Sequence, residues 1–178
     1  MFRATTLMLL LFTDSLVFAQ KMVDGFAARN FTDSSGYSMP YRLFVPADYD
    51  KSRKYPLVVW LHGAGGRGRD NLKQIMGDQI PGTRYWTAPE NQAKYPAFVV
   101  VPQSENFWDG GPSGVAQRAA SEYGDNPSPQ LVRVLGIVDS LQEEFNIDAS
   151  RLYISGQSFG GYGTWSMITK RPEVLPLL

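Results

Sequence analysis

Two long apolar runs limit the folds that this chain can adopt. Residues 55–62 read Tyr-Pro-Leu-Val-Val-Trp-Leu-His, and residues 96–101 read Pro-Ala-Phe-Val-Val-Val. Neither run alternates polar with apolar residues, so each predicts a strand that is buried on both faces, as in parallel sheets covered by helices. The two runs together predict α/β architecture.

Helical and strand signals follow the second run. A period of three to four residues over 127–145 predicts one apolar helical face, and Asn126-Pro127 and Ser128-Pro129 supply the N-cap and proline signals for its start. A strand at 151–155 and a helix at 162–169 come next, so a parallel crossover is expected. The apolar positions of the first helix are Leu131, Val134, Leu135, Val138, Leu141 and Phe145.

The segments around the runs carry weaker signals. Before the first run, strands at 26–33 and 39–45 with a turn at 34–36 predict a β-hairpin. After the second run, which Pro102 closes, residues 103–125 are rich in Gly and Ser and lack a clear period. They predict a long surface loop, and such loops are often functional.

A glycine-rich turn at 156–161, Gly-Gln-Ser-Phe-Gly-Gly, separates the expected strand from the expected helix. It fits the nucleophile elbow Gly-x-Ser-x-Gly, in which the serine occupies a strained turn and the glycines avoid collisions with the neighbouring strand and helix. Ser158 is therefore the candidate nucleophile. A purely structural glycine turn is the alternative.

A second glycine-rich segment, His62-Gly63-Ala64-Gly65-Gly66, follows the first apolar run. Acyl transfer needs preorganised N–H donors for the tetrahedral oxyanion, and glycines keep backbone N–H groups accessible. The candidate donors are the N–H groups of Phe159, directly after the nucleophile, and of Ala64. The 62–66 segment is thus the candidate oxyanion loop.

Gly63, Gly65 and Gly68 also spell G-x-G-x-x-G, the fingerprint of a dinucleotide-binding turn. That fingerprint opens a helix at once and places an acidic residue about twenty positions on, at the end of the next strand. Here Asp78 and Glu90 end no apolar run. A nucleotide site is therefore disfavoured, and neither a cofactor nor a metal is expected.

His62 is the only histidine of the chain. Two roles are open for it: a base for Ser158, or a group that holds the oxyanion loop through its imidazole, which we favour. Trp86, Trp108 and Tyr162 are open between an acyl pocket and plain core packing.

Residues 1–19 predict a secretory signal peptide, with Arg3 ahead of an apolar core at 7–12 and Val17-Phe18-Ala19 at the cleavage site. Cleavage after Ala19 leaves 20–178 as one domain, secreted or periplasmic and without an integral membrane span. The chain has 17 basic and 17 acidic residues and no cysteine. Nucleic acid is therefore an unexpected partner, and disulfides are excluded.

The chain resembles secreted α/β-hydrolase fold serine hydrolases of the carboxylesterase, dienelactone hydrolase and polyhydroxyalkanoate-depolymerase kind, including relatives labelled predicted peptidases. The resemblance implies hydrolysis of a small-molecule or polymer ester through a Ser158 acyl-enzyme, without a cofactor. A serine peptidase of the prolyl-oligopeptidase-like type is the alternative. Four stretches in the same order carry the resemblance, at residues 39–46, 55–65, 86–92 and 151–163.

In that fold the catalytic triad runs Ser, then Asp or Glu, then His. After Ser158 the chain contains Glu173, which is too close to the elbow for the family's acid and is expected to be a surface carboxylate, and it contains no histidine. The resemblance therefore implies the N-terminal portion only of an α/β-hydrolase domain, over 20–178, with later strands missing. We expect a C-terminally truncated chain, for which a catalytically inactive remnant is a further alternative.

Overall fold

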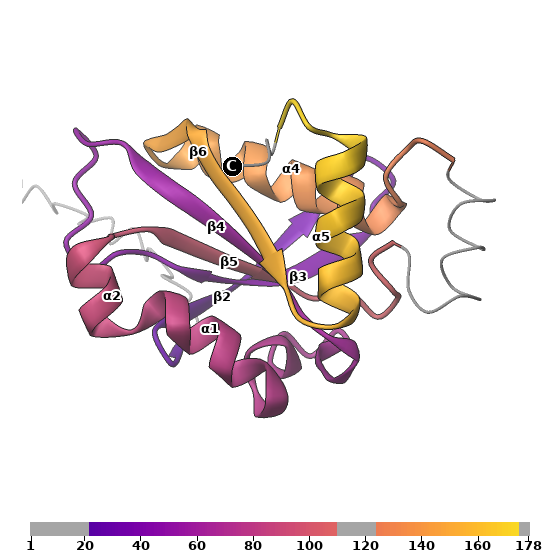
Figure 1. Ribbon diagram of the computed structural model, residues 1–178, viewed down its shortest axis with the longest axis horizontal. Helices are drawn as coiled ribbons and strands as arrows, with labels where there is room; N and C mark the ends of the chain where they lie inside the picture. Colours follow the sequence, from indigo (N-terminus) through magenta and orange to yellow (C-terminus); the bar gives the residue numbers. More distant parts are fainter. Residues whose placement is uncertain (1–21, 110–123, 175–178) are drawn as a thin grey trace, which may run out of the picture.

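The computed structural model describes residues 22–109 and 124–174, so the predicted signal peptide at 1–19 lies outside the described residues. Helices cover both faces of one six-stranded sheet (Figure 1). The strands are β1 (Met22–Val23), β2 (Phe26–Thr32), β3 (Ser38–Phe44), β4 (Tyr55–Leu61), β5 (Phe98–Pro102) and β6 (Ile147–Gly156). The helices are α1 (Ile80–Thr87), α2 (Pro89–Lys94), α4 (Pro129–Glu144) and α5 (Phe159–Lys170), with 3₁₀ turns η1 (Ala64–Gly66), η2 (Lys73–Ile75) and η3 (Gly77–Gln79).

The sheet is mixed, in the order β1-β2-β3-β5-β4-β6. Neighbouring strands among β1, β2, β3 and β5 pair antiparallel, whereas β4 pairs in parallel with both β5 and β6. Figure 1 shows α1 and α2 on one face and α4 and α5 on the other. Leu57, Val59 and Leu61 on one face of β4 are fully buried, and on the other face Val58 is buried while Pro56 and Trp60 are partly buried. The predicted α/β class and the predicted burial of the first apolar run are thus confirmed.

The predicted hairpin is also present. β2 and β3 pair antiparallel from Phe26 opposite Phe44 to Thr32 opposite Ser38. The connecting turn is closed by Asp33, whose side-chain Oδ1 accepts hydrogen bonds from the N–H groups of Ser35 and Tyr37. β1, which pairs with β2, was not predicted because its two residues carry no strand pattern.

Helix α4 begins as predicted. The Oγ atom of Ser128 accepts a hydrogen bond from the N–H of Leu131 and caps the helix, with Pro129 in the first turn. The predicted apolar face is confirmed: its residues pack into one core cluster with β3, β4 and β5, with Phe145 partly buried at the C-terminal end. The buried members are Leu131, Val134, Leu135, Val138 and Leu141.

The first part of the predicted loop, at 103–109, is irregular as predicted, but most of it is buried rather than at the surface, and only Glu105 and Asn106 in this part are exposed. Pro102 continues β5 and lies opposite Tyr41 of β3. Gln103, Ser104, Trp108 and Asp109 are all buried, because their polar atoms find partners inside the protein. The remainder of the predicted loop, at 110–123, lies outside the described residues.

Candidate active site

Ser158 forms the turn between β6 and α5. Its backbone has φ 53° and ψ −113°, a combination that residues with a side chain rarely adopt and that costs free energy wherever it occurs. Its side chain is exposed. An exposed serine on a strained strand-to-helix turn is the geometry of a nucleophile elbow.

Two glycines make this turn sterically feasible. A Cβ atom on Gly160 would lie 1.9 Å from the carbonyl oxygen of Leu61, and a Cβ atom on Gly156 would lie 2.5 Å from the carbonyl carbon of Gly160. Both distances are far below van der Waals contact. The turn is tied further by the N–H of Gln157, which donates to the carbonyl oxygen of Leu61 across 3.1 Å. The elbow and the end of β4 are therefore packed backbone against backbone.

The 62–66 loop lies beside this elbow. A Cβ atom on Gly63 would lie 3.2 Å from the carbonyl oxygen of Gln157, so the structure brings the loop next to the residue that precedes Ser158. Ala64 is the first residue of η1 and Phe159 the first residue of α5. The N–H of a first helical residue has no partner within its own helix, and no acceptor for either N–H is found among the described residues.

Gly65 lies against an acidic side chain. A Cβ atom at this position would lie 2.8 Å from Oδ1 of Asp78. The glycine therefore leaves room for a carboxylate beneath the loop. Only the three-residue turn η1 follows Gly63, rather than a helix that could open a nucleotide site.

His62 is 1% exposed, and both of its ring nitrogens are engaged. Nδ1 lies 2.7 Å from the carbonyl oxygen of Gly63, and Nε2 accepts the N–H of Ser104 across 3.1 Å. A backbone N–H only donates and a carbonyl oxygen only accepts, so the ring is neutral and carries its proton on Nδ1. Burial lowers the pKa of His62 from its ordinary value of 6.5 to about 4.

Aromatic side chains lie near the start of α5, where the elbow ends. The rings of Phe107 and Phe159 are 4.5 Å apart between centroids, and the guanidinium of Arg67 lies 4.9 Å from the Phe107 ring. Tyr162 is 44% exposed, and its ring lies 6.3 Å from that of Phe159. Trp108 is instead fully buried, and its Nε1–H donates to the carbonyl oxygen of His62 across 2.9 Å.

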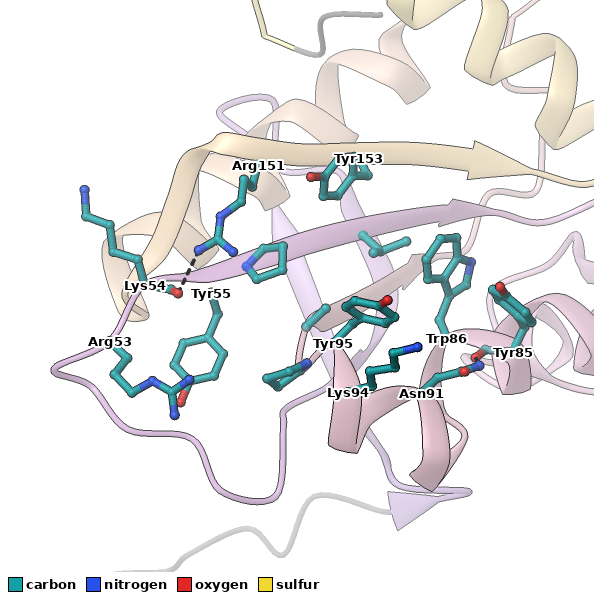
Figure 2. A pocket seen from close by; sticks show the side chains of 14 residues that line it. Arg53, Lys54, Tyr55, Tyr85, Trp86, Asn91, Lys94, Tyr95, Arg151 and Tyr153 are labelled. Carbon is teal, nitrogen blue, oxygen red and sulfur yellow. Dashed lines mark hydrogen bonds between the residues drawn. The ribbon is translucent and has the colours of Figure 1, made fainter. Parts of the chain in front are cut away.

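The cavity in Figure 2 is separate from the elbow. It has a volume of about 470 Å³ and is lined by Arg151 and Tyr153 of β6 and by Tyr85 and Trp86 of α1, among others. None of the residues that line it belongs to the 62–66 loop or to the 156–161 turn. Trp86 therefore lines this cavity, next to Tyr85.

Within 22–109 and 124–174, no group of three or more His, Cys, Asp or Glu side chains is placed to hold a metal ion. In the same ranges, no helix has both the length and the apolar character needed to cross a membrane. Glu173 is a surface carboxylate that pairs with Arg171.

The mixed sheet, the strained serine and the glycine loop beside it have the arrangement of the α/β-hydrolase fold. The chain belongs to the esterase family, because the family model described as "Putative esterase" matches residues 32–175.

Individual relatives agree with this family. The chain is 24% identical over 133 residues to "Probable feruloyl esterase C" of Aspergillus niger, which covers 75% of this chain and 42% of that protein. It is 25% identical over 148 residues to "S-formylglutathione hydrolase" of Arabidopsis thaliana, which covers 80% of this chain and 51% of that protein. The chain thus spans about half the length, or less, of these curated relatives.

Solved structures show the same fold. A thermostable esterase superposes with a TM-score of 0.74 at 44% sequence identity, covering 85% of this chain and 39% of that one. A ferulic acid esterase from Anaeromyces mucronatus superposes with a TM-score of 0.55 at 18% identity, covering 89% of this chain and 58% of that one. At 18% identity the second comparison supports the fold alone.

Proposed function

We propose that the intact protein hydrolyses carboxylic esters through an acyl-enzyme on Ser158. The observation that carries the proposal is the exposed and strained backbone position of Ser158 beside the 62–66 loop. A serine held in such a position serves chemistry rather than stability. Membership of the esterase family supports the same conclusion.

The proposed reaction has two steps. Ser158 Oγ attacks the ester carbonyl carbon, its proton passes to a base, and collapse of the tetrahedral intermediate releases the alcohol, which takes up that proton. Water then attacks the acyl-enzyme, the carboxylic acid leaves, and Ser158 regains its proton. His62 is unsuited to be the base because both of its ring nitrogens are held by backbone groups. We assign that role to another group of the intact protein.

The N–H groups of Phe159 and Ala64 would stabilise the negative charge of the tetrahedral oxygen. Each such preorganised donor contributes roughly 3 kcal/mol to transition-state stabilisation. In this proposal His62, Gly63 and Gly65 are not catalytic residues. They shape the loop that presents Ala64.

An active-site-directed fluorophosphonate tests the assignment in the intact natural protein. We expect one covalent adduct on Ser158, located by mass spectrometry of peptides, and loss of both adduct and ester turnover in Ser158→Ala. Ser155→Ala, in the preceding strand β6, is the matched control and should keep both. An adduct that persists in Ser158→Ala would refute the role of Ser158.

Feruloyl esters and S-formylglutathione are the first substrates to assay, because relatives of this chain bear those names. The Phe107 and Phe159 rings next to the elbow offer a surface on which a planar acyl group can stack. We therefore expect aryl acyl esters to have the higher kcat/KM of the two. A preference for the formyl thioester would argue for a small acyl site instead.

A serine peptidase is the second candidate. The chain is 28% identical over 147 residues to "Venom dipeptidyl peptidase 4" of Vespula vulgaris, although it spans 16% of that protein. Matched ester and amide substrates with the same acyl group separate the candidates. We expect the ester to be cleaved at least about a hundredfold faster, and comparable rates would favour the peptidase.

We also propose that the protein is exported, on the basis of the charge and apolar pattern of residues 1–19. N-terminal sequencing of the protein from the natural host should then begin at Gln20. A mature protein that begins at Met1 and stays inside the cell would contradict export.

A further inference from the structure

We infer that Gln79 is a positioning residue for the oxyanion hole: it holds the 62–66 loop so that the N–H of Ala64 points toward the substrate. The inference rests on the function proposed above. Gln79 ends the turn η3, is fully buried and belongs to none of the motifs that mark the site. Its role is visible only in the hydrogen bonds that surround two successive peptide groups.

The first peptide group joins His62 to Gly63 and is held at both polar ends. Its N–H, on Gly63, donates to Oε1 of Gln79 across 2.7 Å. Its carbonyl oxygen, on His62, accepts the Nε1–H of Trp108 across 2.9 Å. Because a peptide group is planar, two such contacts fix its orientation.

The second peptide group joins Gly63 to Ala64 and is held at one end only. Its carbonyl oxygen, on Gly63, accepts hydrogen bonds from Nδ1 of His62 across 2.7 Å and from the N–H of Gly66 across 3.1 Å. In a trans peptide the N–H points away from the carbonyl oxygen, so these contacts also fix the direction of the Ala64 N–H. Among the described residues, that N–H has no backbone or side-chain acceptor.

Gln79 is itself held in a defined orientation. Its Nε2 donates to Oδ1 of Asp78 across 2.7 Å. A carboxylate only accepts and the Gly63 N–H only donates, so Oε1 must face the loop and Nε2 must face Asp78. The side-chain amide cannot flip without losing both bonds. Gln79 therefore offers the loop a fixed acceptor rather than an adaptable one.

Gln74 provides a matched control. It is also a fully buried glutamine, and its Nε2 donates to Oδ1 of Asn71 across 2.6 Å. It makes no hydrogen bond to the 62–66 loop, and its Oε1 has no partner among the described residues. The same substitution at 74 and at 79 removes the same side chain from equally buried sites, and only at 79 does it remove a direct hydrogen bond to the loop.

The test uses the intact natural protein and steady-state kinetics on an aryl ester. We expect Gln79→Leu to lower kcat about tenfold to a hundredfold while KM changes less than about threefold. The reason is that a misdirected Ala64 N–H weakens stabilisation of the transition state more than it weakens substrate binding. Gln74→Leu should keep kcat within about threefold of the wild type. An equal loss of kcat in both variants would reduce Gln79 to a structural residue.

A double variant separates loss of the hydrogen bond to Gly63 from misfolding of the protein. Gln79→Glu with Asp78→Asn keeps an oxygen acceptor for the Gly63 N–H and replaces the Asp78 carboxylate by an amide that can donate to the new carboxylate. The net charge is unchanged. We expect this exchange to restore kcat to within about threefold of the wild type. If the double variant folds and is as slow as Gln79→Leu, the inference is wrong.

A second readout needs no turnover. Backbone amide exchange in the peptide that contains 62–66 should become at least about tenfold faster in Gln79→Leu and stay unchanged in Gln74→Leu. Unchanged exchange in Gln79→Leu would overturn the inference even if ester hydrolysis is confirmed. Absence of ester turnover in the wild type would overturn the proposed function, and with it the oxyanion role, while the exchange result would still show whether Gln79 holds the loop.

Discussion

The backbone N–H of Ser104 donates a hydrogen bond to Nε2 of His62 across 3.1 Å, although the two residues are 42 positions apart in the chain. This contact and the bond from Nδ1 to Gly63 commit the only histidine of the sequence to one neutral tautomer. Protonation of Nε2 would remove the acceptor that Ser104 needs. His62 therefore fastens β4 and its loop to the segment that follows β5.

Stability should fall as His62 is forced to take up a proton. Its pKa is about 4 in the folded protein and 6.5 ordinarily, so the unfolded chain binds more protons between these values and stability rises with pH in that window. Above pH 6.5 the contribution is complete, and it is lost as the pH falls toward 4. The loss is on the order of 3 kcal/mol, measurable as a shift in the urea midpoint.

Carboxylates affect stability in a lower pH range than His62 does, so the two contributions can be separated. Hydrogen bonds from Ser35 and Arg133 hold the pKa of Asp33 at about 2, below its ordinary 3.8, so its contribution is lost only as the pH falls from 3.8 toward 2. Nitrogen-15 NMR of the imidazole gives the direct check. A His62 titration midpoint near 6.5 would contradict the predicted dependence.

Gly160→Ala should destabilise the fold by about 2 to 4 kcal/mol, because its Cβ would lie 1.9 Å from the Leu61 carbonyl oxygen. Gly161→Ala is the control, since the nearest atom to its Cβ is 3.7 Å away. That change should be neutral or slightly stabilising through helix propensity. The urea midpoints of both variants test this prediction. Equal midpoints would show that the backbone of the elbow can shift to accommodate a Cβ atom at position 160.

Lys170→Met should cost about 3 kcal/mol, because it leaves the buried carboxylate of Asp109 without its cation. Lys170 Nζ lies 3.0 Å from Asp109 Oδ2, and the Asp109 side chain is 2% exposed. The exposed Lys94 offers a comparison, and Lys94→Met should change stability by less than about 0.5 kcal/mol. Thermal unfolding measures both, and adding Asp109→Asn to Lys170→Met should recover part of the loss.

Ser158→Gly should make the protein more stable by about 1 kcal/mol, whereas Ser158→Ala should not. Glycine adopts a positive φ without strain, but alanine meets the same restriction as serine at φ 53°. Both variants lose the hydroxyl, so neither should react with a fluorophosphonate. Equal stability of the glycine and alanine variants would mean that the turn is not strained.

The sequence predicted the elements that have strong local signals. The apolar run at 55–62 became β4, the period at 127–145 became α4, and the turn at 156–161 took up the strained geometry that its glycines indicate. Hydrophobic period and glycine spacing are properties of adjacent residues. They can therefore be interpreted without knowledge of what lies nearby in space.

The parts that were missed depend on distant partners. Helix α1 was not predicted: it contains Pro81 and Gly82, which proline's tolerance in the first helical turn and the room that the missing Cβ of Gly82 leaves for the Trp60 ring make possible. Gln79 and Trp108 reach the 62–66 loop from 16 and 46 residues away. Their types and positions form no motif.

The order of the strands has a consequence for how the chain acquires its shape. β4 pairs with β5 and β6, and both are made after it, so a nascent chain carries an apolar strand that must wait for its two neighbours. Pairings between distant segments form slowly, and a waiting apolar strand is exposed to aggregation. Because the elbow follows β6, the geometry of Ser158 is completed only when this last described strand docks. The strained backbone geometry of Ser158 is therefore expected to form only after β6 has paired with β4.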